Sequence, residues 1–121
     1  MNVSIIFTKE GGRVSDIGKR LQEVERRIEA ARRRSPYGQD VILVAVTKFH
    51  PLENMEEVLR LGVTQVGENR VQEMEEKHDR LTLPAVWHLQ GHLQRNKVKK
   101  AVALADLIQS VDSAGILEEI D

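Results

Sequence analysis

A lysine directly follows the longest apolar run in the chain, and a lysine amine becomes reactive when it is partly withdrawn from water. Lys48 comes after Thr47, at the end of the run Val41–Val46. Partial desolvation lowers the pKa of a lysine and frees the neutral amine, which condenses with an aldehyde or ketone to form a Schiff base. The alternative interpretation of Lys48 is a solvated surface charge, and the residue type alone favours it.

Small and polar residues also end the next apolar run. Gly67, Glu68 and Asn69 follow the run that begins at Val63. A glycine lets a ligand approach the backbone closely, and an asparagine offers both a donor and an acceptor to a ring hydroxyl or carbonyl. In the alternative interpretation Asn69 caps a helix and Glu68 lies at the positive end of that helix. The two interpretations are compatible.

Two histidines near the third run raise the question of a metal site. His88 lies inside this run and His92 just beyond it. No carboxylate or cysteine is spaced to complete a ligand set, so we expect no metal. The polar segment 91–97 contains Arg95 and Lys97, and it either holds an anion or is simply solvated.

The apolar runs themselves predict how these residues are positioned. They begin at Val41, Val63, Ala85 and Leu107, a spacing of 22 residues, and a helical stretch follows each. Parallel strands joined by crossover helices collect chemistry where the strands end. We therefore expect an α/β fold of parallel (β/α) units, about half of a TIM-type barrel, since a closed barrel needs about 250 residues. An open flavodoxin-like sheet is the alternative, but it requires reordered strands and helices on both faces.

The chain divides into three parts on this interpretation. Residues 1–14 are expected to be an extended or poorly ordered leader, residues 15–34 an amphipathic N-terminal helix, and residues 41–121 four βα units. All three belong to a single partial domain.

The composition excludes several classes of function. The 121 residues are 40% hydrophobic and carry a formal charge of −1, which gives no general attraction to nucleic acid or to an anionic membrane. There is no cysteine, so disulfides, thiolate metal sites and thiol nucleophiles are excluded. The sequence has no apolar stretch of membrane-spanning length and no secretory signal, and it contains no GxGxxG, Walker or GxSxG motif. We expect a cytoplasmic location.

Four motifs, in this order, resemble those of one known family. The segments are Val44–Pro51 (VAVTKFHP), Gly67–Glu73 (GENRVQE), Trp87–Lys97 (WHLQGHLQRNK) and Ser110–Ser113 (SVDS). Together they are similar to the pyridoxal phosphate homeostasis proteins, single-domain barrels that resemble the N-terminal domain of alanine racemase.

The resemblance implies a cofactor and the residues that hold it. It implies that Lys48 forms a Schiff base with pyridoxal 5′-phosphate (PLP) and that Asn69 lies in the cofactor pocket. It places His88, Gly91 and Ser110 near the same pocket. It assigns no catalytic residue and no metal ligand.

This chain departs from the family pattern in two ways. Members often carry a second lysine two positions after the first, where this chain has His50. The later family segments, which hold the phosphate and supply an arginine to the pyridine nitrogen, have no counterpart here. We therefore expect the chain to correspond to the N-terminal half of such a protein.

The function implied by the resemblance is reversible PLP binding in vitamin B6 homeostasis, without established catalysis. A PLP-dependent amino-acid racemase is one alternative, but the only tyrosine, Tyr37, precedes the first predicted barrel strand and so belongs to the opposite barrel end. A cofactor-free lysine aldolase and a non-catalytic assembly domain are the others. The expected partner is a small-molecule cofactor, with possible self-association through the open sheet edges.

Overall fold

The computed structural model describes residues 2–6, 14–37, 40–47, 50–109 and 114–120. The strands are β1 (Asn2–Ile6), β2 (Ile42–Val46), β3 (Gln65–Glu68), β4 (Val86–Leu89) and β5 (Leu107–Ile108). The helices are α1 (Val14–Arg34), α2 (Leu52–Arg60), α3 (Val71–Arg80), the short 3-10 helix η2 (Arg95–Lys97), α4 (Val98–Leu104) and α5 (Ala114–Ile120).

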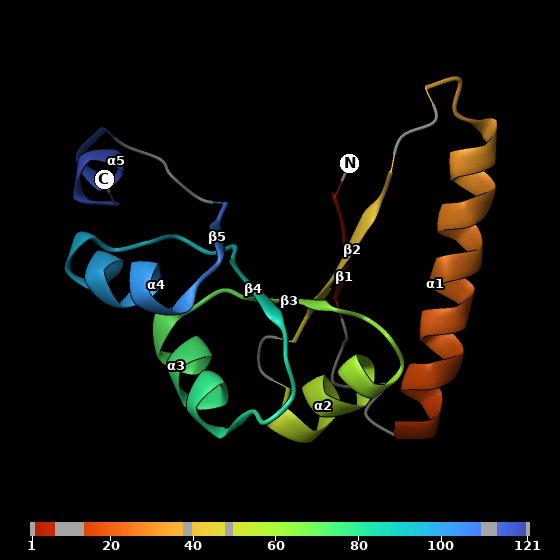
Figure 1. Ribbon diagram of the computed structural model, residues 1–121, viewed down its shortest axis with the longest axis horizontal. Helices are drawn as coiled ribbons and strands as arrows, with labels where there is room; N and C mark the ends of the chain where they lie inside the picture. The colour runs from red at the N-terminus through yellow and green to blue at the C-terminus, as the bar shows by residue number, and fades with distance from the viewer. Residues whose placement is uncertain (1, 7–13, 38–39, 48–49, 110–113, 121) are drawn as a thin grey trace.

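The strands form one parallel sheet in the order β1-β2-β3-β4-β5, with the helices arranged around its outside (Figure 1). Consecutive strand order is what a barrel requires and a flavodoxin-like sheet does not have. The prediction of α/β units forming part of a TIM-type barrel is therefore confirmed. The register is close to the 22-residue spacing of the apolar runs but does not repeat it: Gly67 pairs with Val46 and with His88, each 21 residues away, and His88 pairs with Leu107, 19 residues away.

The expectation of a leader over residues 1–14 needs a correction at residues 2–6, whereas residues 1 and 7–13 lie outside the described part of the chain. Asn2–Ile6 forms a strand that pairs with β2 along its whole length. The polar and glycine-containing stretch that follows Phe7 in the sequence led us to place these residues outside the sheet. The described chain therefore carries one more strand than the four predicted.

The hydrophobic core lies between the sheet and the helices. Ala45 of β2 packs with residues of α1 and α2, and Val66, Trp87 and Leu89 of the next two strands pack with residues of α2, α3, α4 and α5. Because side chains alternate between the two faces of a strand, residues 65 and 67 of β3 and residue 88 of β4 face the other side, the barrel interior. Among the described helices, none has the length and apolar character needed to cross a lipid bilayer.

Candidate functional site

A buried polar cluster lies at the carboxyl end of β2 and β3. Lys77 Nζ donates hydrogen bonds to the main-chain oxygen of Thr47 at 2.7 Å, to Glu68 Oε1 at 2.8 Å and to Glu73 Oε1 at 3.0 Å. Thr47 Oγ1 donates to the same Glu68 oxygen at 2.5 Å. We call Thr47, Glu68, Glu73 and Lys77 the Lys77 cluster. It joins the ends of two strands to the helix that follows the second of them.

Local geometry explains why these side chains meet beneath the sheet. Glu68 ends β3 and, like Val66 two residues earlier, faces the helices. Lys77 follows Met74 by three residues, so it lies on the stripe of α3 that faces the core. Glu68 is 0% exposed and Lys77 only 6%. Charged groups are buried to this degree only when they are paired.

The surroundings of the Glu68 carboxyl shift its pKa in opposite directions. Burial raises its pKa, while the hydrogen bonds from Lys77 and Thr47 lower the pKa and partly offset that effect. Its second oxygen, Oε2, is buried and has no hydrogen-bond partner among the described residues. The ionised carboxylate therefore depends on Lys77 for most of its compensation.

The interior face of the sheet carries a second polar network, centred on His88. Its Nε2 lies 2.6 Å from Gln65 Oε1, and its Nδ1 lies 2.8 Å from Gln109 Nε2. Gln109 Oε1 in turn accepts from Gln90 Nε2 at 3.2 Å. An amide oxygen only accepts and an amide nitrogen only donates, so this arrangement corresponds to a neutral imidazole with its proton on Nε2. Burial lowers the pKa of His88, and the charge of Asp106 opposes that shift.

The lowered pKa of His88 predicts how the free energy of unfolding depends on pH. Its unfolded value lies near 6.5, so the folded state binds fewer protons than the unfolded state as pH falls below that value. The stability contributed by neutral His88 is present above pH 6.5 and is lost as pH falls through 6.5 toward the folded pKa. We expect the free energy of unfolding of the wild type to fall relative to His88→Gln, a neutral donor-acceptor replacement, in urea titrations at decreasing pH. A difference that stays constant with pH would contradict this.

Gly91 and Asn69 approach each other closely. A Cβ atom built on Gly91 would lie 2.1 Å from the main-chain oxygen of Asn69. Only a residue without a side chain fits there, which explains the glycine in physical terms. The alternative interpretation of Asn69 as a helix cap is wrong, because the capping position of α3 is Arg70 and no side-chain cap is formed there.

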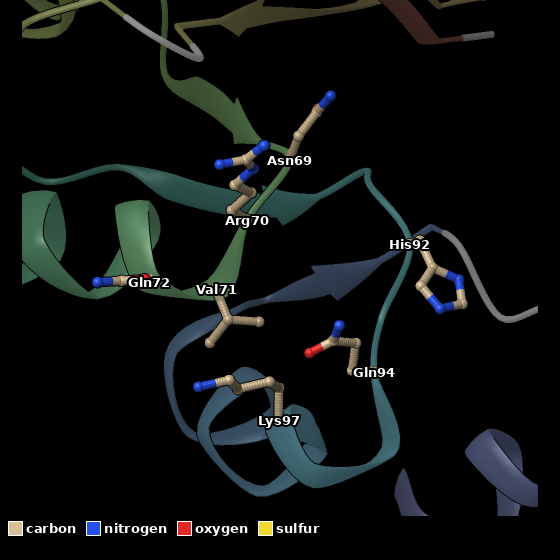
Figure 2. A pocket seen from close by; sticks show the side chains of 7 residues that line it. All are labelled: Asn69, Arg70, Val71, Gln72, His92, Gln94 and Lys97. Carbon is tan, nitrogen blue, oxygen red and sulfur yellow. The ribbon is translucent and has the colours of Figure 1, made fainter.

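A cavity of about 340 Å³ lies at the amino ends of α3 and η2. Its lining comes from two segments: Asn69, Arg70, Val71 and Gln72, and then His92, Gln94 and Lys97. Figure 2 shows Val71 and Gln94 directed toward each other, whereas the Asn69 amide extends away from Gln94 and Lys97. The lining carries basic side chains and no acidic one, which suits an anion better than a cation.

His50, which stands where the family often has a second lysine, is buried. Its Nδ1 lies 3.2 Å from Asn54 Nδ2, and its main-chain nitrogen donates to the main-chain oxygen of Thr47 at 3.0 Å. Thr47 O therefore accepts two hydrogen bonds, one from His50 and one from Lys77. His50 contributes to the backbone turn that follows β2.

The structure tests the placement of only part of the predicted site. Lys48 and Ser110 lie outside the described residues. Asn69 and Gly91 are brought together, and His88 lies one strand from Gly67, on the interior face. Sequence reasoning missed Lys77, although one signal pointed to it: a lysine at a core-facing position of a helical pattern.

Several curated proteins similar to this chain share one name. It is 38% identical over 104 residues to a pyridoxal phosphate homeostasis protein of Aquifex aeolicus, a match that covers 84% of this chain and 46% of that protein. It is 38% identical over 81 residues to the protein of the same name from Schizosaccharomyces pombe, covering 65% of this chain and 34% of the other. This sequence is a relative of the pyridoxal phosphate homeostasis proteins. It spans less than half the length of these two members, and no family model matches it.

Solved structures agree with the relationship. PipY of Synechococcus elongatus PCC7942, solved with PLP bound, superposes with a TM-score of 0.70 at 38% identity, over 86% of this chain and 46% of PipY. A protein from Bifidobacterium adolescentis superposes with a TM-score of 0.73 at 30% identity, over 94% of this chain and 51% of the other. The partial barrel fold and the relationship to this family are thus supported both in sequence and in structure.

Proposed function

We propose that this chain binds PLP through a Schiff base on Lys48 and takes part in PLP homeostasis as a carrier rather than as a catalyst. The observation that carries the proposal is the match in sequence and fold to PipY, whose solved structure holds PLP. Lys48 follows Thr47 directly, and Thr47 is buried at the carboxyl edge of the sheet, where ligands of this fold bind.

The described residues suit such a ligand. Lys48 itself lies outside them; in the proposal its neutral amine attacks the aldehyde carbon, a C=N bond forms and water leaves. His88 is fully buried and both its ring nitrogens are hydrogen-bonded, so it supports the site through Gln65 and Gln109, whose amides are neutral polar groups on the interior face. Asn69, held beside Gly91, offers an amide at the sheet edge. We assign these residues and Ser110 to the cofactor site, with no metal.

The location of one residue, Tyr37, favours PLP binding without turnover over racemisation. A racemase needs a second acid-base group on the other face of the cofactor. Tyr37, the only tyrosine in the chain, is 79% exposed and precedes β2, at the edge of the sheet opposite Thr47. It cannot serve as that group within this chain.

The test is to trap the Schiff base with borohydride after adding PLP and to locate the label by peptide mass analysis. We expect the label on Lys48 and a loss of specific labelling in Lys48→Ala. Lys100→Ala is the matched control, because Lys100 pairs with Glu75 on the exposed surface and should not alter the label. Label spread over surface lysines and unchanged in Lys48→Ala would overturn the proposal.

The remaining parts of the proposal concern location and partners. We place this binding in the cytoplasm, as the sequence led us to expect, with no nucleic-acid or membrane partner. Leu107 of the edge strand β5 is 47% exposed, which supports the proposed self-association through an open sheet edge. Size measurement of the purified chain at several concentrations distinguishes monomers from dimers.

A further inference from the structure

The Lys77 cluster is buried beneath the sheet, on the face opposite the proposed cofactor, yet it is bonded to the residue that precedes Lys48. Lys77 Nζ lies 2.7 Å from Thr47 O, the carbonyl of the peptide bond that joins Thr47 to Lys48. The main-chain nitrogen of Thr47 donates to Gly67 O at 3.1 Å. Thr47 is therefore held at its nitrogen, its carbonyl and its side chain.

Lys77 is itself fixed by its partners. Its side chain is 7% exposed, and its ammonium has three acceptors, two of them the carboxylates of Glu68 and Glu73. An ammonium that donates three hydrogen bonds has no free donor and no lone pair, so Lys77 cannot compete as a nucleophile. Glu68 is itself the last residue of β3, so the ammonium ties two neighbouring strand ends together.

We infer that Lys77 is a positioning residue for Schiff-base formation, because it fixes the carbonyl from which the chain continues to Lys48. The inference rests on the proposed function. The reacting atoms remain those of Lys48 and the aldehyde, and Lys77 acts only through the backbone. Small displacements of a reacting group cost large factors in rate, so the effect of losing this contact is measurable.

The experiment compares two variants that both lack the Glu68 charge. Glu68→Gln is the reference, and the double variant Glu68→Gln/Lys77→Met also removes the donor to Thr47 O without leaving a buried carboxylate at Glu68. Borohydride trapping at Lys48 gives the rate of Schiff-base formation, and thermal unfolding by circular dichroism reports the fold. Binding of 4′-deoxypyridoxine 5′-phosphate, which lacks the aldehyde, reports the pocket separately. Lys100→Met controls for loss of a lysine at the exposed surface.

We expect trapping at Lys48 to be about tenfold slower in the double variant than in Glu68→Gln, with affinity for the aldehyde-free analogue within about twofold. Equal trapping rates would overturn the inference. A parallel loss of trapping and of analogue affinity would also overturn it, because it shows general loosening. If the double variant does not unfold cooperatively, the Lys77→Arg variant is used instead. It keeps a cation beside Glu68 and Glu73 but shifts the donor to Thr47 O. A trapping rate at Lys48 equal to that of the wild type would then overturn the inference. Absence of label at Lys48 in the wild type overturns the proposed function itself, and this inference with it.

Discussion

Lys77→Met should lower the free energy of unfolding by about 3–5 kcal/mol at neutral pH, the cost of removing one partner from a buried ion pair. The substitution leaves Glu68 fully buried with the hydrogen bond from Thr47 as its remaining described contact. Its Oε2 already has no partner among the described residues. Urea unfolding followed by circular dichroism measures the loss.

Lowering the pH should reduce the loss of stability caused by Lys77→Met. Burial already raises the pKa of Glu68, and removal of the neighbouring ammonium raises it further. The folded variant therefore takes up a proton at a higher pH than the unfolded chain does, so its stability recovers relative to the wild type as pH falls through the raised value. For the same reason, Glu68→Gln/Lys77→Met should be more stable at neutral pH than Lys77→Met alone.

Comparison with Lys100→Met isolates the effect of burial on the stability that a lysine–glutamate pair contributes. Lys100 Nζ lies 3.2 Å from Glu75 Oε2, a distance similar to those in the Lys77 cluster, but its side chain is 56% exposed. Exposed pairs contribute only about 0–1 kcal/mol, so the stability of this variant should change little. A Lys77→Met variant no less stable than Lys100→Met would refute the view that the buried cluster supports the fold.

The regular spacing of the four apolar runs explains how much of the fold could be predicted from the sequence. Each apolar run has the length of a buried strand, and the constant spacing leaves room for one crossover helix, so strand order and direction follow from the general rules for parallel sheets. The bounds of the strands could not be predicted in this way: β5 contains only Leu107–Ile108, and Gln109 already lies beyond it. The apolar runs that begin at Val63 and Ala85 start before the strands β3 and β4 do, so apolar character alone does not show where the hydrogen-bonded ladder lies.

The candidate site was harder to predict because its buried charges are paired across elements. Glu68 was expected at the positive end of a helix, whereas its carboxylate is covered by Lys77 from nine residues later. A strand residue and a helix residue meet only through the packing of α3 on the sheet, which local spacing does not encode. His88 was placed on its strand correctly, but its partner Gln65 belongs to β3 and its partner Gln109 directly follows β5.

Gly91→Ala is expected to destabilise the protein by about 3 kcal/mol, at the upper end of the cost of overpacking. The added methyl would lie 2.1 Å from Asn69 O and 2.9 Å from the carbonyl carbon of Asn69. Both atoms belong to the backbone that leads into α3, so no side-chain rotation relieves the clash. The segment carrying Asn69 must move instead, and PLP trapping at Lys48 should weaken together with stability.

Gly18→Ala provides the opposite result from the same chemical change. Gly18 lies within α1, and the nearest atom to an added methyl is Leu61 Cδ1 at 3.9 Å, an ordinary contact. Alanine in a helix interior is favoured over glycine by about 0.5–1 kcal/mol, so this variant should be as stable as the wild type or slightly more stable. Thermal unfolding of both variants makes the comparison. Equal stabilities would mean that Asn69 and Gly91 do not approach as closely in solution, and the proposed cofactor site would then lose the close packing of Gly91 against the main chain of Asn69.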